Sequence, residues 1–198
     1  EPVWWDDHYR KLVADCRQLA LDCPTRADWE QDIAWVAARL PDAVLKLVVT
    51  RGPAPRGYRV PVPAWPTRVV LASPLPDFPD PVRATGAVVR LCDLRLGQQP
   101  RLAGAKHLNR LENVLARMEW DSPDIDEGVL LDQDGRVVSG VMSNLFARVD
   151  GAWLTPDLSR CGVAGVTRGR LLGLLDARVA DLALCDLDRA DAVLLCNS

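Results

Sequence analysis

The sequence is poor in lysine, since Lys11, Lys46 and Lys106 are the only residues of 198 that carry an amine side chain. Acidic residues outnumber basic ones, and the formal net charge is −3. Without a basic excess the chain has little charge with which to displace counterions from phosphates, so we expect no nucleic-acid partner. It also lacks an apolar run of about 20 residues, the length that a membrane helix needs, so we expect no membrane partner.

Metal-binding and disulfide spacings are missing as well. Six cysteines are present, but they form no Cys-x-x-Cys pair and no short-spaced framework. The sequence therefore predicts neither a metal site nor a disulfide scaffold, and a reducing cytoplasm is the expected compartment. With 48% hydrophobic residues, a chain of this length can bury the core of one large or two small domains.

The first part of the chain predicts two helices. Asp6 or Asp7 can cap a first helix, after which apolar residues recur at helical spacing. Thr25 and Asp28 have the spacing of a capping box ahead of a second helix. Both helices are amphipathic, and we expect each to bury one face.

Strands and a linker are expected next. Residues 43–50 and 67–73 are rich in Val and Leu and predict two strands. Four prolines follow almost at once, a density that neither a helix nor a central strand tolerates. We therefore expect an interdomain linker over 76–82, which separates a small α/β domain over 1–75 from a larger domain over 83–198.

The larger domain mixes strands and helices, so the fold class is α+β. Asp134-Gly135 and Asp150-Gly151 stand between short apolar runs and are typical of hairpin turns. We therefore expect an antiparallel meander rather than a parallel sheet. The expected elements are strands over 87–94, 182–185 and 192–196, and helices over 107–120 and 165–180.

Lys106 stands between the turn-forming Gly104-Ala105 and the expected helix over 107–120. That helix places an apolar row on one face, which we expect to be buried: Leu108, Leu111, Leu115 and Met118. Burial disfavours the charged form of a lysine, and a neutral lysine is a nucleophile for carbonyl compounds. By spacing alone, a solvated surface lysine is the commoner alternative.

Three segments in order strengthen the functional interpretation of Lys106. KHLNRLE at 106–112, SNLF at 143–146 and TPDLSRCGVAGVTR at 155–168 resemble the cofactor-binding signature of the class IV pyridoxal-phosphate enzymes. The resemblance extends over nearly the whole chain. It implies the two-domain α+β fold of that family, pyridoxal 5'-phosphate as cofactor, a small-molecule substrate and a homodimer. Lys106 is then the catalytic residue, which binds the cofactor aldehyde covalently and moves a proton at the substrate carbon.

Within the family the chain most resembles the aminodeoxychorismate lyases, which release 4-aminobenzoate and pyruvate from 4-amino-4-deoxychorismate in folate biosynthesis. Two alternatives stay open: a D-amino-acid or branched-chain aminotransferase, and a weakened or non-catalytic relative. Family members carry further residues at both ends, so we expect this chain to be an internal segment or a variant without those parts.

The resemblance assigns the phosphate of the cofactor to Gly165, Val166 and Thr167. Glycine lets the chain turn into a helix whose first N–H groups face an anion, and the Thr167 hydroxyl adds a donor. Asn197 and Ser198 occupy the place of further phosphate donors, and Asn144 of the SNLF run is also expected to bind the cofactor.

The first departure from the family pattern is at Lys11. The family has an arginine in an H-x-x-R-L arrangement that binds the phosphate, and here His8 and Leu12 flank Lys11 in that place. Lysine keeps the positive charge but loses the planar, two-pronged donor set. We expect a weaker grip on the phosphate.

The second departure is at Ser139. The family has a glutamate here, before SNLF, which pairs with the pyridine nitrogen of the cofactor. A carboxylate keeps that nitrogen protonated, whereas a hydroxyl only shares a hydrogen bond with a neutral ring. Elimination stores less charge on the ring than amino transfer does, so a lyase tolerates serine better.

Candidate substrate-binding residues are Arg56, Tyr58 and Arg110. Arg56 and Tyr58 lie in a loop rich in glycine and proline, and the implied substrate carries two carboxylates that guanidinium groups bind well. A solvated surface loop is the alternative for the first two, and a salt bridge on a helix surface is the alternative for Arg110.

Overall fold

The computed structural model describes residues 2–40, 42–76 and 85–198. The chain divides into two compact units, Glu1–Pro79 and Asp80–Ser198. The linker expected over 76–82 lies outside the described residues except for Pro76. Within the described ranges, every helix is too short or too polar to cross a lipid bilayer.

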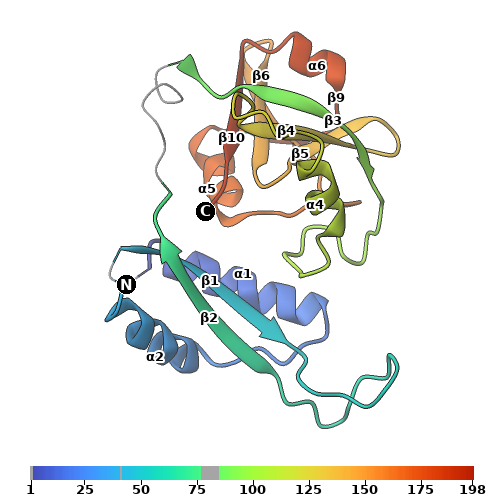
Figure 1. Ribbon diagram of the computed structural model, residues 1–198. Helices are drawn as coiled ribbons and strands as arrows, with labels where there is room; N and C mark the ends of the chain where they lie inside the picture. The colour runs from blue at the N-terminus through green and yellow to red at the C-terminus, as the bar shows by residue number, and fades with distance from the viewer. Residues whose placement is uncertain (1, 41, 77–84) are drawn as a thin grey trace. The chain divides into compact units, whose positions relative to one another are not determined.

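The first unit contains two helices and a two-stranded sheet (Figure 1). Its elements are α1 (Trp5–Gln18), α2 (Arg26–Ala37), β1 (Ala43–Thr50) and β2 (Thr67–Pro74). The strands are antiparallel, with Ala43 opposite Pro74 and Thr50 opposite Thr67. Trp5, Trp29 and Ile33 of the helices form the core, and apolar residues of both strands pack against them.

The helix starts of this unit differ in how they are capped. At α2 the expected capping box is present: the Asp28 N–H donates to the Thr25 hydroxyl at 3.2 Å, and the Thr25 N–H donates to the Asp28 carboxylate at 3.1 Å. At α1 the expected cap is wrong. Trp4 is the N-cap and makes no side-chain cap, while Asp6 and Asp7 lie in the first turn. There they interact favourably with the positive end of the helix dipole.

The second unit is built around two four-stranded sheets (Figure 1). Their strand orders are β3-β4-β5-β9 and β10-β6-β7-β8. The elements are β3 (Val89–Leu96), α4 (Leu111–Arg117), β4 (Glu127–Asp132), β5 (Arg136–Gly140), β6 (Asn144–Val149), β7 (Ala152–Pro156), α5 (Val166–Leu174), β8 (Arg178–Ala180), β9 (Leu182–Ala183), α6 (Leu184–Asp188) and β10 (Ala192–Cys196).

The strand connections of this unit are mixed. The two expected hairpins are confirmed, since β4 pairs with β5 and β6 with β7 in the antiparallel sense. The expected meander is nevertheless wrong, because β3–β4 and β7–β8 are parallel pairs. Parallel neighbours need a crossover connection, and the segments that carry α4 and α5 supply one each.

The core of the second unit lies on both faces of β4 and β5. On one face, Leu130 and Val138 pack with Trp120 and with Ala116 of α4. On the other, a second group packs between the two sheets: Val129, Leu131, Val137, Leu145, Ala147, Val149 and Leu182. Burial on both faces explains why these central strands are almost continuously apolar.

The helix expected over 107–120 is shorter than predicted, and its apolar row faces outward. It spans Leu111–Arg117, and the exposed fractions are 64% for Leu108, 65% for Leu111, 47% for Leu115 and 71% for Met118. The helix buries Ala116 instead, since a small residue allows close packing on the sheet. The expected burial of the leucine row is therefore wrong.

Two later elements also end earlier than expected. The helix expected over 165–180 stops at Leu174, and residues 178–180 pair with β7 as β8. The strand expected over 182–185 covers Leu182–Ala183, after which α6 begins. At β8, pairing with a distant strand decided the outcome over local helix preference, whereas β9 is cut short by the start of a local helix.

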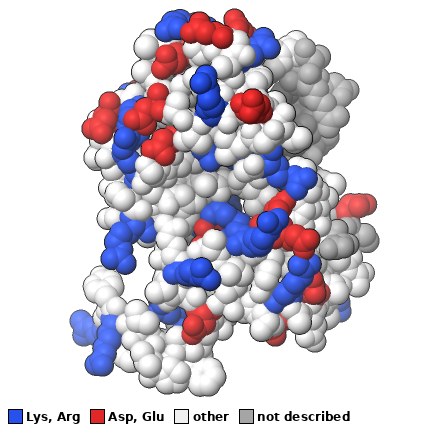
Figure 2. Space-filling view, turned by 180° about the vertical axis from the view of Figure 1, so that it is seen from behind, with Lys and Arg blue, Asp and Glu red and all other residues white. Residues whose placement is uncertain are grey.

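Acidic and basic side chains stand next to one another on the face in Figure 2. Arg26 pairs with Asp6 at 2.5 Å and with Glu30 at 2.7 Å, and Arg136 pairs with Asp181 at 2.9 Å. The two pairs of Arg26 are exposed, and exposed pairs contribute little to stability.

Candidate active site

Lys106 lies in an irregular loop before α4 rather than at the helix start, and it is exposed. Two residues earlier, Gly104 forms a bridge to Val163: the Gly104 N–H donates to the Gly162 carbonyl, and the Ala164 N–H donates to the Gly104 carbonyl, both at 3.0 Å. Gly104 has a φ of 78°, which glycine adopts without strain. The bridge therefore fixes the Lys106 loop to the segment that leads into α5.

Asn144 holds that segment from the other side. Its amide nitrogen donates to the Val163 carbonyl at 2.7 Å, and its amide oxygen accepts from the Gly165 N–H at 3.1 Å. A Cβ at residue 165 would stand 2.5 Å from this oxygen, so only glycine fits there. Asn144 thereby positions the start of α5, and its predicted contact with a cofactor stays a prediction.

The start of α5 is also joined to the last residues of the chain. The Thr167 hydroxyl donates to the Asn197 carbonyl at 3.0 Å, and the Asn197 amide lies 3.5 Å from the Met142 carbonyl. Figure 1 shows the C-terminus, Ser198, beside α5. The N–H groups of a first helical turn have no acceptor within the helix, so Val166 and Thr167 belong to a turn suited to an anion.

A buried arginine fixes α5 to the sheet. Arg168 donates to the Thr155 hydroxyl at 3.1 Å and to the Pro156 carbonyl at 2.9 Å, both in β7. Burial lowers the pKa of this guanidinium from its ordinary value. The sequence analysis missed Arg168, because nothing in the local pattern distinguishes it from Arg170, the exposed arginine of the same helix.

Ser139 is buried near the end of β5, and its hydroxyl donates to the Gly140 carbonyl at 2.8 Å. The hydroxyl proton is therefore used by the backbone in this structure, and the oxygen remains an acceptor. A hydroxyl in this place offers a ring nitrogen no negative charge.

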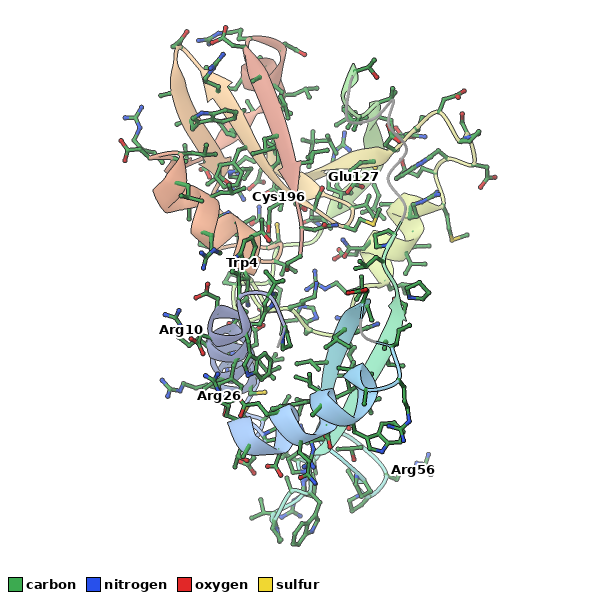
Figure 3. All side chains as sticks on the ribbon, turned by 90° about the vertical axis from the view of Figure 1, so that its left-hand side faces the viewer. Trp4, Arg10, Arg26, Arg56, Glu127 and Cys196 are labelled. Atoms are coloured by element: carbon green, nitrogen blue, oxygen red, sulfur yellow. The ribbon has the colours of Figure 1, made fainter. Side chains whose placement is uncertain are left out.

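Glu127, labelled in Figure 3, was missed by the sequence analysis. It begins β4 and is buried, and its carboxylate accepts from the N–H groups of Val141 at 3.1 Å and Met142 at 3.2 Å and from the Ser143 hydroxyl at 2.8 Å. The turn that it holds connects Ser139 to Asn144. A carboxylate directly before an apolar run was the available signal, but its burial is visible only in three dimensions.

Arg110 is half-buried and faces its own loop. Its guanidinium donates to the carbonyls of His107 at 3.3 Å and Ala105 at 3.4 Å, and it contacts His107 Nε2. Burial lowers the pKa of this guanidinium. The alternative of a salt bridge on the helix surface gives way to bonds on either side of Lys106, while the predicted contact between Arg110 and substrate stays a prediction.

The other predicted residues belong to the first unit. Lys11 forms an ion pair with Asp15 one turn along α1. Arg56 and Tyr58 are exposed in the loop between β1 and β2, where Figure 3 labels Arg56. Their neighbour Arg51 donates to the Leu19 carbonyl at 2.7 Å and so caps the end of α1.

The second unit thus joins an exposed lysine loop to a helix start suited to an anion through direct hydrogen bonds, and it also holds a buried hydroxyl at Ser139. This set fits a cofactor that carries an aldehyde and a phosphate: Lys106 suits the aldehyde, and residues 165–167 suit the phosphate. At a ring nitrogen the fit is weaker, because Ser139 is a neutral partner.

Comparisons with known proteins identify the family. Residues 1–198 match the family model described as amino-transferase class IV. The chain is 35% identical to the aminodeoxychorismate lyase of Vibrio harveyi, over 98% of this chain and 73% of the relative. The crystal structure of 4-amino-4-deoxychorismate lyase from Pseudomonas aeruginosa matches with 44% identity and a TM-score of 0.92, again over 98% of this chain and 73% of that one. A branched-chain amino acid aminotransferase structure from Escherichia coli, 21% identical with a TM-score of 0.77 over 96% of this chain and 66% of that one, shares the fold.

Proposed function

Because the chain belongs to the amino-transferase class IV family, we propose that it is a pyridoxal-phosphate-dependent lyase that converts 4-amino-4-deoxychorismate to 4-aminobenzoate and pyruvate. The observation that carries the proposal is the bridge between Gly104 and Val163, which joins the Lys106 loop to the start of α5. Similarity to two proteins named as this lyase supports the choice of substrate.

The residues of the second unit have distinct tasks in this reaction. Lys106 would hold the cofactor through its side-chain amine, and when that amine is free it would take the proton from the amine-bearing ring carbon of the substrate. The first turn of α5 binds the phosphate, with Asn197 and Ser198 as further donors. When bound, pyridoxal phosphate accepts electron density from the substrate carbon. Breakage of the ring carbon–oxygen bond would then release the side chain as enolpyruvate, which gains a proton to become pyruvate, and the ring would become aromatic.

Ser139 favours elimination over amino transfer. A neutral pyridine stabilises a carbanion poorly, and amino transfer must hold that carbanion and reprotonate it elsewhere. Expulsion of a leaving group removes the same electrons in one direction. Two other candidates remain: an aminotransferase, supported by the shared fold, and a non-catalytic relative, supported by Ser139 and by the Lys11–Asp15 ion pair.

The test of the reaction compares two substrates with cofactor-saturated protein. We expect 4-amino-4-deoxychorismate to yield 4-aminobenzoate faster than D-alanine or a branched-chain amino acid with 2-oxoglutarate yields glutamate. Faster glutamate formation would establish the aminotransferase instead. No product from either mixture would favour the non-catalytic relative.

The lysine assignment has a separate test. Because Lys11, Lys46 and Lys106 are the only lysines, borohydride reduction followed by peptide mapping distinguishes them completely. We expect the reduced cofactor on Lys106, and we expect Lys106→Ala but not Lys46→Ala to abolish the yellow colour of the protein. Cofactor on Lys46, or on no lysine, would contradict the assignment.

We further propose that the protein is a homodimer of the cytoplasm. Support for self-association comes from α4, where Leu111, Val114, Leu115 and Met118 form an exposed row at helical spacing. Contact with a second copy of the chain would bury this row. The six free cysteines are in keeping with a reducing compartment.

A further inference from the structure

The guanidinium of Arg110 is bound to the residues on both sides of Lys106. Its Nη2 donates to the Ala105 carbonyl at 3.4 Å and contacts His107 Nε2, and its Nε donates to the His107 carbonyl at 3.3 Å. Ala105 is fully buried and Arg110 is half-buried. The residues directly before and after the exposed lysine, Ala105 and His107, are thus both held by the Arg110 side chain.

The contact with His107 involves a ring nitrogen that can accept a hydrogen bond. A guanidinium has donors and no acceptor, so in this contact Nε2 of His107 is the acceptor. Arg110 and His107 therefore form a matched donor and acceptor, which a change at either residue would break.

Because Arg110 is half-buried, its guanidinium needs these hydrogen bonds to the loop. Moving a guanidinium away from water is costly unless its donors find acceptors, and the loop carbonyls supply them. The same bonds remove backbone freedom from residues 105–107. Together with the bridge from Gly104 to Val163, they anchor the loop on both sides of Lys106.

We propose that Arg110, with His107, is a positioning residue that sets the direction of the Lys106 amine toward the start of α5. This inference rests on the proposed role of Lys106 in the lyase. It gives Arg110 a task within the lysine loop, in place of the substrate contact that the sequence suggests. A loop that is fixed in advance loses little entropy when its lysine forms a bond, so cofactor attachment is favoured.

The experiment compares three variants with the wild type. Arg110→Met keeps the length of the side chain and removes every donor, and Arg110→Lys keeps the charge but not the planar fork. Arg117→Met is the matched control, because Arg117 lies on the same helix and also donates to a carbonyl, that of Trp120 at 2.7 Å. Circular dichroism establishes that each variant is folded.

Two measurements are made on each protein. Amide hydrogen exchange over residues 105–110 reports loop order in cofactor-free protein, and visible absorbance with borohydride mapping reports pyridoxal phosphate bound to Lys106. We expect Arg110→Met to speed exchange at least fivefold and to weaken cofactor loading about tenfold, the effect of losing charge-assisted hydrogen bonds. Arg110→Lys should fall between Arg110→Met and wild type, and Arg117→Met should match wild type in both measurements.

Three outcomes count against the proposal. Unchanged loading with a raised KM for 4-amino-4-deoxychorismate would make Arg110 a substrate-binding residue. Faster exchange in Arg110→Met with an unchanged visible spectrum would mean that Arg110 orders the loop without affecting cofactor attachment. Unchanged exchange would mean that Arg110 does not order the loop. If wild-type Lys106 takes up no pyridoxal phosphate, the proposed function fails, and exchange alone then decides whether Arg110 orders the loop.

Discussion

At the scale of single residues, Ser139 has the largest chemical consequence. Its hydroxyl donates to the Gly140 carbonyl in a buried position where the family resemblance implies a carboxylate. A carboxylate there would be unpaired in cofactor-free protein and paired with a protonated ring nitrogen in the loaded protein. The two states should therefore respond to a glutamate in opposite directions.

We predict that Ser139→Glu tightens pyridoxal phosphate binding by about 1–3 kcal/mol, the value of a regained charge-assisted contact. In cofactor-free protein the same change should lower the melting temperature. Cofactor titration by visible absorbance and thermal unfolding with and without cofactor measure the two effects. The control is Ser122→Glu at an exposed serine, which should change neither.

Lys11→Arg belongs to the same comparison. The arginine fork can bind a phosphate and Asp15 together, so affinity should rise without a loss of stability. If the double variant with Ser139→Glu and Lys11→Arg binds cofactor no more tightly than wild type, neither position faces the cofactor.

At the scale of elements, the turn between β5 and β6 depends on one buried carboxylate. Glu127 accepts from Val141, Met142 and Ser143, and this turn connects Ser139 to Asn144. The bonds join the start of β4 to the residues directly before β6, so they fix the place where β6 begins. Asn144, the first residue of β6, in turn holds the start of α5.

We predict that Glu127→Gln destabilises the fold by about 2 kcal/mol or more, because an amide group then faces buried N–H donors that have lost their acceptor. Cofactor loading should fall together with stability. Denaturant unfolding measures the first effect, and visible absorbance measures the second. Asp93→Asn is the control, since the Asp93 side chain is 94% exposed; an equal loss in both variants would mean that the turn does not depend on Glu127.

At the scale of the whole molecule, the outward apolar row of α4 is the basis of the proposed homodimer. The row contradicts the expected burial within the chain, and a helix face of this kind is stable in water chiefly when another surface covers it. A charge placed in the middle of such a covered surface remains unpaired.

We predict that Met118→Glu weakens self-association at least tenfold, through the cost of burying that charge. Sedimentation over a range of protein concentrations measures the effect. Leu174→Glu is the matched control, because Leu174 is a comparably exposed apolar residue, 76% against 71%, on another helix of the unit. A wild-type protein that stays monomeric at all concentrations would rule out the homodimer.

Local patterns in the sequence determined much of this protein. The hairpins at Asp134-Gly135 and Asp150-Gly151, the capping box of Thr25 and Asp28, and the strand at β1 follow from residues close together in the chain. Family membership and the α+β class also followed, because three motifs of specific composition kept their order. These features depend on turn chemistry, helix caps and periodicity, and residues close together in the sequence determine all three.

The tertiary structure decided what depends on distant partners. No local sequence pattern predicts four of the observed features. They are the parallel pairing of β3 with β4, the short α4, the buried carboxylate of Glu127 and the inward direction of the Arg110 side chain. Each results from competition among surfaces and hydrogen-bond donors that meet only when the chain has folded. A charged residue is exposed by default, and only hydrogen-bond partners of the matching type, donors for a carboxylate and acceptors for a guanidinium, make its burial stable.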